Sequence, residues 1–143
     1  MYDLKLPDLI RLKSFKEAEN TITLDLAPLG FRGPPKEHNE VYNCLKDVLT
    51  GLKGVHEQGW VHRDVKLANV ILCLDGTWHL IDLDLAVKMN EQVKLHDHFG
   101  IMEIPHADCQ DNENWQPKHD VQQVVIMLQS LKLLFWDKGA GEN

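Results

Sequence analysis

The fold of this chain is decided by the stretch Trp60-Val61-His62-Arg63-Asp64-Val65-Lys66-Leu67-Ala68-Asn69 and by the later triplet Asp82-Leu83-Asp84. Together they supply three carboxylates, an ammonium group and an amide. Apolar runs flank the first stretch, which indicates that its polar side chains are held on a framework. Carboxylate and amide oxygens are ligands that Mg²⁺ accepts, and an ammonium group suits a phosphate. The two segments therefore predict a site that holds Mg²⁺ and a phosphate beside a nucleophile.

Length and composition fit a single domain or a part of one. The chain has 143 residues, of which 43% are hydrophobic and 26% charged, and its formal net charge is −7. This acidity argues against a sequence-independent nucleic-acid binder, because such binding depends on Lys and Arg that neutralise phosphates. The first ten residues contain no apolar signal core, and no run approaches the roughly 18 apolar residues of a membrane helix. We therefore expect an intracellular, cytoplasmic protein with neither a nucleic-acid nor a membrane partner.

The first half of the chain changes from a strand pattern to a helix pattern. Residues 9–12 and 21–26 read as two strands, with a polar turn over 16–20 between them. Prolines and glycines over 28–35 then interrupt regular structure. From residue 40 to 57 apolar residues recur every three or four positions, which predicts an amphipathic helix with Asn39 as its N-cap.

The segment after residue 69 has the pattern of a β-hairpin. Residues 70–74 form a short apolar run, Asp75-Gly76 is a strong turn signal, and residues 77–81 return and deliver Asp82. Residues 85–118 are polar and irregular. Asp120 then opens a helix that is apolar over most of its surface, which predicts a buried central helix.

The chain resembles the catalytic core of a eukaryotic-type protein kinase in the order of its elements and motifs. That order is the helix, His62-Arg63-Asp64, Lys66, Asn69, the hairpin and Asp82. Lys66 matches the serine/threonine version of this motif. The resemblance implies an α+β fold with a mainly helical C-lobe, a catalytic-loop β-hairpin and two N-lobe strands. It also implies that residues 1–143 are one partial, truncated kinase-like domain, with an N-lobe remnant (9–26), a hinge (27–35) and a C-lobe core (36–136).

The same resemblance implies a role for each site residue. Asp64, Lys66 and Asn69 would be catalytic, with Asp64 orienting the attacking hydroxyl and Lys66 neutralising the moving γ-phosphoryl group. Asn69 and Asp82 would bind Mg²⁺. Asp84 is a further candidate metal ligand, the alternative being a solvated side chain.

The resemblance further implies that the cofactors are ATP and Mg²⁺. The hinge is expected to contact adenine through Ala27 and Leu29, and Ile71 is expected to lie under the ring. His62, Leu83 and Asp120 would belong to the internal scaffold of the C-lobe. The expected partners are ATP and a protein, either as substrate or as a bound partner.

Several features depart from the family pattern. The sequence contains no GxGxxG loop and no Val-Ala-Ile-Lys strand, so the usual clamp on the ATP phosphates is missing and we expect weak activity. Asp82-Leu83-Asp84 replaces the usual Asp-Phe-Gly. No Ser, Thr or Tyr lies between residues 77 and 130. Arg63 is therefore expected to pair with a carboxylate or with none, the candidates being Asp97, Glu103 and Asp108.

Three alternatives stay open at this point. A catalytically inactive pseudokinase would use the same fold as a binding module. A small-molecule phosphotransferase of the aminoglycoside or choline kinase type carries an Asp-x-Asp motif, which Asp82-Leu83-Asp84 matches, but Arg63 and Lys66 fit that class poorly. A zinc site competes with a merely solvated loop, because His and Cys cluster at His96, His98, His106, Cys109 and His119.

Overall fold

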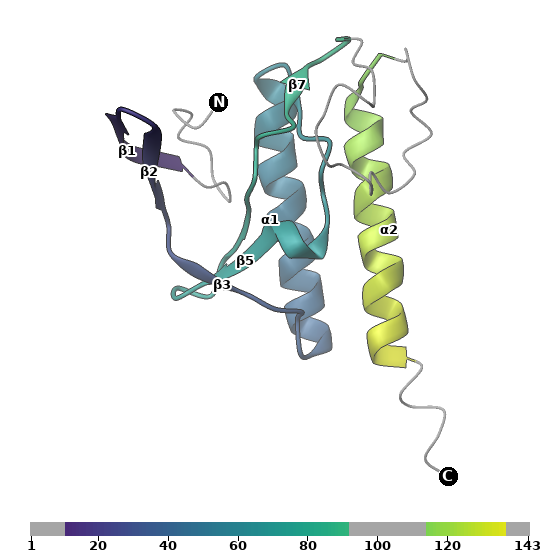
Figure 1. Cartoon of the computed structure of the whole chain (residues 1–143). Coiled ribbons are helices and arrows are strands. Elements are labelled where there is room, and N and C mark those ends of the chain that lie inside the picture. Colours follow the sequence, from purple (N-terminus) through teal and green to yellow (C-terminus); the bar gives the residue numbers. More distant parts are fainter. Residues whose placement is uncertain (1–10, 92–113, 137–143) are drawn as a thin grey trace.

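The computed structural model describes residues 11–91 and 114–136. Two long helices dominate these residues, α1 (His38–Glu57) and α2 (Pro117–Trp136). Figure 1 shows them side by side, with an N-terminal hairpin well to one side of both. The helices are antiparallel, because His56 near the end of α1 contacts Asp120 near the start of α2. The expected α+β class is confirmed.

The N-terminal hairpin pairs β1 (Arg11–Ala18) with β2 (Thr21–Ala27) in antiparallel register, with Phe15 opposite Leu24. Two strands were predicted here, but the turn is shorter than predicted because residues 16–18 continue β1. Residues 13–26 are exposed, although they include Phe15, Ile22, Leu24 and Leu26. Residues 9 and 10 of the predicted first strand lie outside the described residues.

A three-stranded antiparallel sheet has the order β3–β5–β6. Its strands β5 (Val70–Cys73) and β6 (Trp78–Leu80) form the predicted hairpin. The Thr77 N–H donates to Asp75 Oδ1 at 3.0 Å, and Gly76 has a φ of +85°. The Asp-Gly turn is therefore formed as predicted, because glycine adopts this left-handed conformation without strain.

The strand β3 (Gly30–Arg32) lies inside the segment that was predicted to be irregular, so that prediction is wrong at this point. It pairs with β5, and a Cβ atom on Gly30 would lie 2.8 Å from the carbonyl oxygen of Leu72. Glycine is therefore required for this close approach. The pairing partner is distant in the sequence, which is why the local pattern does not indicate a strand.

Two short strands, β4 (Trp60–Val61) and β7 (Val87–Lys88), pair at the start of the loop that carries Asp64. The Met89 N–H extends this pairing by donating to the Gly59 carbonyl oxygen at 2.8 Å. The prediction that residues 85–118 are irregular is therefore wrong for β7, and residues 92–113 lie outside the described residues. The segment that follows the β5–β6 hairpin is thus brought back, through β7, to the start of the loop that carries Asp64.

Both helices begin earlier than predicted. The first residue of α1 is His38, and its N-cap is Glu37 rather than Asn39. The Glu37 N–H donates to the Glu40 carboxylate at 3.2 Å, which satisfies an amide that no helical carbonyl can reach. The first residue of α2 is Pro117, and proline suits this position because it has no N–H to leave unsatisfied.

The hydrophobic core lies between α1, α2 and the β5–β6 hairpin. Burial raises the pKa of the Cys44 thiol in this core to about 12, and the nearby Asp47 carboxylate adds to the effect. The Asp47 carboxylate also accepts the backbone N–H of Trp78 at 2.9 Å and so connects α1 to β6. The core consists of Cys44, Val48, Leu52, Val55, Val65, Val70, Trp78, Leu80, Val124 and Met127.

One face of α2 differs from the prediction of a helix buried over most of its surface. Val121 is 46% exposed, Val125 48% and Leu128 38%. Their spacing places them along one side of the helix, so the prediction is wrong for that side. Among the helices of the described residues, none has the length and apolar character that crossing a membrane requires.

Replacing Leu52 by alanine is expected to lower the free energy of unfolding by about 2–5 kcal/mol, because the change removes buried methyl groups and leaves a cavity. Leu52 is 1% exposed, whereas Leu49 on the same helix is 44% exposed. Leu49→Ala is therefore the matched control, and it is expected to lower the free energy of unfolding clearly less than Leu52→Ala does. Urea unfolding followed by circular dichroism measures both changes, and equal losses would contradict this description of the core.

Candidate active site

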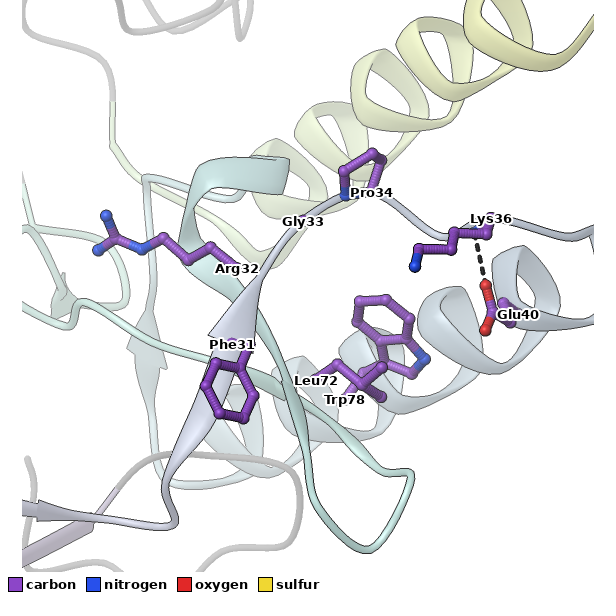
Figure 2. A pocket seen from close by; sticks show the side chains of 8 residues that line it. All are labelled: Phe31, Arg32, Gly33, Pro34, Lys36, Glu40, Leu72 and Trp78. Carbon is purple, nitrogen blue, oxygen red and sulfur yellow. Dashed lines mark hydrogen bonds between the residues drawn. The ribbon is translucent and has the colours of Figure 1, made fainter.

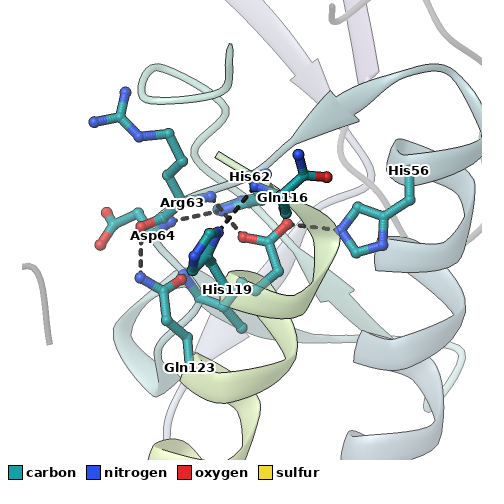
Figure 3. Close-up of polar contacts among 9 residues, drawn as sticks. His56, His62, Arg63, Asp64, Gln116, His119 and Gln123 are labelled. Carbon is teal, nitrogen blue, oxygen red and sulfur yellow. Dashed lines mark hydrogen bonds and ion pairs between the residues drawn. The ribbon is translucent and has the colours of Figure 1, made fainter. Parts of the chain in front are cut away.

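The loop that carries Asp64 is held by a buried carboxylate on α2. Asp120 is 0% exposed, and its two oxygens accept the backbone N–H groups of His62 and Arg63, each at 2.8 Å. His56 Nε2 on α1 lies 2.7 Å from the same carboxylate (Figure 3). Asp120 therefore connects the end of α1, the start of α2 and the loop, in agreement with its expected place in the scaffold.

Gln123 on α2 bonds to the same loop on both sides of Asp64 (Figure 3). Its Nε2 donates to the Arg63 carbonyl oxygen at 2.7 Å, and its Oε1 accepts the Val65 N–H at 2.9 Å. The sequence analysis missed this residue. The available signal was the spacing of Gln123 three positions after Asp120, since residues at that spacing share a helix face.

His62 is fully buried, and its ring adopts one defined tautomer. Its Nδ1 accepts the Asp64 N–H at 3.1 Å, and its Nε2 lies 3.0 Å from the Ile81 carbonyl oxygen, so Nε2 must carry the proton. Loss of solvent lowers the pKa of His62, and this effect outweighs the opposing attraction of Asp120. The neutral ring links the loop to the end of the β5–β6 hairpin.

The carboxylate of Asp64 has a neighbour at each oxygen. Asn69 Nδ2 donates to Asp64 Oδ2 and to the Asp64 carbonyl oxygen, both at 2.8 Å. Lys66 Nζ lies 3.4 Å from Asp64 Oδ1. Asp64 and Asn69 are buried, whereas the Lys66 side chain is 40% exposed. The three residues predicted to be catalytic thus lie together on one loop.

The pairing of β5 with β6 brings Asn69 next to Asp82. The Ile81 N–H donates to the Asn69 carbonyl oxygen at 2.8 Å, and Asp82 follows directly. Asp82 has a φ of +65°, a conformation that is uncommon for residues other than glycine and recurs at functional sites. The Asp84 N–H lies 3.4 Å from Asp82 Oδ1. Because Asn69 uses its Nδ2 on Asp64, its Oδ1 is the atom that could bind a cation.

A model of the family described as "Protein kinase domain" matches residues 3–131. The chain belongs to the protein kinase domain family. This match confirms the resemblance predicted from the motifs around Asp64 and Asp82.

Curated relatives match shorter parts of the chain. Crinkler effector protein 8 of Phytophthora infestans is 35% identical over 78 residues, which cover 54% of this chain and 13% of that protein. MAP3K epsilon protein kinase 1 of Brassica napus is 42% identical over 57 residues, covering 39% and 4%. Cell division control protein 7 of Schizosaccharomyces pombe is 47% identical over 51 residues, covering 36% and 4%. The kinase domain described above thus spans only a small part of the length of these relatives.

Arg63 of this kinase domain has a φ of +75° and is buried. Its guanidinium lies 4.5 Å from the centre of the Trp115 ring, and its Nη1 donates to the Leu85 carbonyl oxygen at 3.2 Å. The predicted acidic partners Asp97 and Glu103 lie outside the described residues. The contact with Trp115 was not predicted, because the sequence around it has no periodic pattern that would place it against the loop.

The hinge predicted to contact adenine passes beside β5. Gly30 pairs with Cys73, and a Cβ atom on Gly30 would lie 2.9 Å from Ile71 Cδ1, so the middle of the hinge and Ile71 are neighbours. Leu29 is 71% exposed and Ala27 is partly buried. The roles of Ala27, Leu29 and Ile71 in nucleotide binding stay a prediction.

A separate concavity of about 220 Å³ lies where β3 leads into α1 (Figure 2). Phe31 and Leu72 line it and are opposite one another in the β3–β5 pairing. Because side chains alternate along a strand, these two residues lie on the opposite face of the sheet from Ile71. The concavity is therefore distinct from the predicted adenine position. Its other lining residues include Arg32, Lys36, Glu40 and Trp78.

His119 is the member of the candidate zinc cluster that falls within the described residues. It is buried at the start of α2, where its Nδ1 accepts the Gln116 N–H at 2.9 Å and its ring packs edge to face on Trp115. The cluster members from His96 to Cys109 lie outside the described residues. Within residues 11–91 and 114–136, no group of three or more His, Cys, Asp or Glu is placed to hold a metal ion.

Acidification is expected to destabilise this kinase domain through His62. The unfolded chain takes up a proton near the ordinary histidine pKa of about 6.5, whereas the buried ring resists protonation. The contribution of His62 to the free energy of unfolding is therefore fully present above that pH. It falls as the pH drops below it, by up to about 1.4 kcal/mol per pH unit for one proton.

The measurement is the free energy of unfolding in urea between pH 5 and 8, for the wild type and for His62→Asn. The Asn side chain can still accept the Asp64 N–H but does not titrate. All other residues are the same in both proteins, so the difference between the two pH profiles reports the contribution of His62. Parallel pH profiles for the two proteins would contradict the assignment of a neutral buried ring.

Proposed function

We propose that this chain is a protein kinase-like domain that binds ATP with Mg²⁺ and transfers the γ-phosphoryl group to a Ser or Thr hydroxyl. Activity in the 143-residue chain is weak. The observation that carries the proposal is the cluster of Asp64, Lys66 and Asn69, held next to Asp82 by backbone pairing. The family match supports the same reaction class.

Asp64 acts on the acceptor hydroxyl. Asn69 already donates to Asp64 Oδ2, so Oδ1 is the oxygen proposed to accept the hydrogen bond of the hydroxyl. As the hydroxyl oxygen bonds to the γ-phosphorus, the bond from that phosphorus to the bridging oxygen breaks, ADP leaves, and Oδ1 receives the hydroxyl proton. Lys66 Nζ lies 3.4 Å from Oδ1 and so stands where it can balance the charge of the transferred group. Phosphoryl transfer needs little beyond such positioning and charge stabilisation.

Asn69 and Asp82 suit Mg²⁺, because each offers an oxygen ligand at the same end of the β5–β6 hairpin. Two protein side chains are enough for Mg²⁺ when phosphate oxygens and waters complete its shell. Bound Mg²⁺ supplies positive charge to the ATP phosphates. Asp84 is exposed and bonded through its N–H to Asp82, which makes it a further candidate ligand.

The adenine ring is proposed to lie against Ala27, Leu29 and Ile71. Within the 143 residues, which contain no GxGxxG loop and no Val-Ala-Ile-Lys strand, Mg²⁺ and Lys66 are the groups proposed to hold the phosphates. Weak positioning of the phosphates slows the transfer, because positioning is the main catalytic resource of this chemistry.

A small-molecule acceptor is the second candidate. Asp82 and Asp84 lie on one turn and are joined by a hydrogen bond, which is the Asp-x-Asp arrangement expected of a small-molecule phosphotransferase. Asp64 and Asn69 would keep their roles in that case, and the acceptor alone would differ.

ATP with Mg²⁺ at about 100 times its Kd is expected to raise the melting temperature by several degrees, because such a ligand adds about 2.7 kcal/mol to the folded state. Asp82→Ala is expected to abolish this shift. Glu17→Ala is the matched control, since it removes an exposed carboxylate on β1 and leaves the site intact. Scanning fluorimetry measures all three proteins, and no shift in the wild type at millimolar ATP would favour a binding module without nucleotide.

Transfer of radiolabelled phosphate from ATP to a Ser/Thr peptide library is expected for the wild type. Asp64→Asn should lower the rate by about 10²–10⁴-fold, because the amide cannot take the proton of the hydroxyl. The same variant should keep the melting shift with ATP and Mg²⁺. Aminoglycosides and choline, tested in parallel, identify the second candidate if they are labelled and the peptides are not. Undiminished transfer by Asp64→Asn would refute the role of Asp64.

A further inference from the structure

The backbone on either side of Asp64 is held by side chains rather than by a helix or a sheet. Two polar groups next to this residue, the Arg63 carbonyl and the Val65 N–H, share one partner. The other partners are Asp120 for the Arg63 N–H, His62 Nδ1 for the Asp64 N–H and Asn69 Nδ2 for the Asp64 carbonyl.

The shared partner is Gln123, which is 1% exposed. We propose that Gln123 is a positioning residue: its amide fixes the peptide groups before and after Asp64 and so sets the direction of the Asp64 carboxylate. The inference rests on the phosphoryl transfer proposed above, in which Asp64 acts on the acceptor hydroxyl.

The chemistry of the glutamine side chain matches what the loop presents. The loop offers one acceptor, the Arg63 carbonyl oxygen, and one donor, the Val65 N–H. A primary amide supplies the complementary donor and acceptor in one planar group. A carboxylate at position 123 would supply two acceptors, and a thioether would supply no strong hydrogen bond.

The loop needs such support because of the conformation of Arg63. Its φ of +75° is rarely adopted by a residue with a side chain, so the surroundings must impose it. Asp120 fixes the N–H of Arg63 and Gln123 fixes its carbonyl, so both ends of this residue are held from one face of α2.

The hydrogen bonds of Gln123 reach the backbone around Asp64, whereas Asn69 and Asp82 are linked through the Ile81 N–H. Loss of the Gln123 amide should therefore act first on the direction of the Asp64 carboxylate, whereas Asp82 and the Asn69 backbone stay linked through the Ile81 N–H. The expected signature is a lower kcat with an unchanged KM for ATP.

The test compares two substitutions with the wild type. Gln123→Met keeps nearly the same size and removes both hydrogen bonds. Gln123→Glu keeps an acceptor for the Val65 N–H and removes the donor to the Arg63 carbonyl. Gln129→Met is the matched control, because it makes the same chemical change at an exposed position of α2.

The first readout is amide hydrogen exchange followed by heteronuclear NMR, which requires no activity. In Gln123→Met the Val65 amide should exchange at least about tenfold faster, while the Arg63 amide, bonded to Asp120, stays protected. Gln123→Glu should keep the Val65 amide protected. Unchanged exchange at Val65 in Gln123→Met would overturn the proposal, and so would equal acceleration at Arg63, which would indicate general loosening.

The second readout is steady-state transfer of phosphate. Gln123→Met should lower kcat by about 10–100-fold with KM for ATP unchanged, Gln123→Glu should lie between it and the wild type, and Gln129→Met should match the wild type. A kcat equal to that of the control would overturn the proposal.

If Gln123→Met does not fold, the test rests on Gln123→Glu. A reduced kcat with the Val65 amide still protected would then support the proposal, and a kcat equal to that of Gln129→Met would overturn it. If the wild type transfers no phosphate, the proposed function fails, while selective loss of Val65 protection would still support Gln123 as the residue that holds the loop.

Discussion

The structure depends on a single buried carboxylate. Asp120 accepts the N–H groups of His62 and Arg63 and lies 2.7 Å from His56 Nε2. A carboxylate removed from water is costly unless donors replace its hydration, and three donors from two other segments do so here. Because those donors belong to α1 and to the loop, the contact between the two helices and the conformation of the loop before Asp64 share this one carboxylate.

The parts of the fold that could be predicted from the sequence are those with a local physical cause. The apolar repeat that forms α1 and the Asp75-Gly76 turn act within a few residues, and both are found in the structure. The strands β3 and β7 are different, because each forms by pairing with a segment far away in the sequence. The N-cap of α1 was misassigned for a different reason. Asn39 is a preferred residue type at an N-cap and Glu37 is not, but the helix begins at His38 and the Glu37 N–H bonds to the Glu40 carboxylate.

The same distinction applies to the site. Four candidate site residues lie close together in the sequence at a spacing that a known motif shares. The sequence alone was therefore enough to identify Asp64, Lys66, Asn69 and Asp82 as candidates. Gln123 and Trp115 could not be identified in this way, because they reach the loop from α2 and from the segment before it. The spacing from Asp120 indicates the face of α2 on which Gln123 lies, but it does not show which groups of the loop Gln123 contacts. The motif identifies the loop and Asp120, whereas the other partners of the loop come from tertiary packing.

The burial of the site residues separates two tasks that a kinase domain combines. Asp64 and Asn69 are buried and fixed through bonds to α2 and to the β5–β6 hairpin, whereas Leu29 in the hinge is 71% exposed and residues 13–26 of the β1–β2 hairpin are exposed. Order at the proposed base and the proposed metal ligands thus comes mainly from contacts with α2 and with the β5–β6 hairpin. The proposed contact of the adenine ring with Leu29 would instead lie on the exposed side of the molecule. The two groups of residues are held by different contacts. Substitutions in the core should therefore lower mainly the rate of the proposed transfer, whereas substitutions in the hinge should weaken mainly the proposed binding of nucleotide.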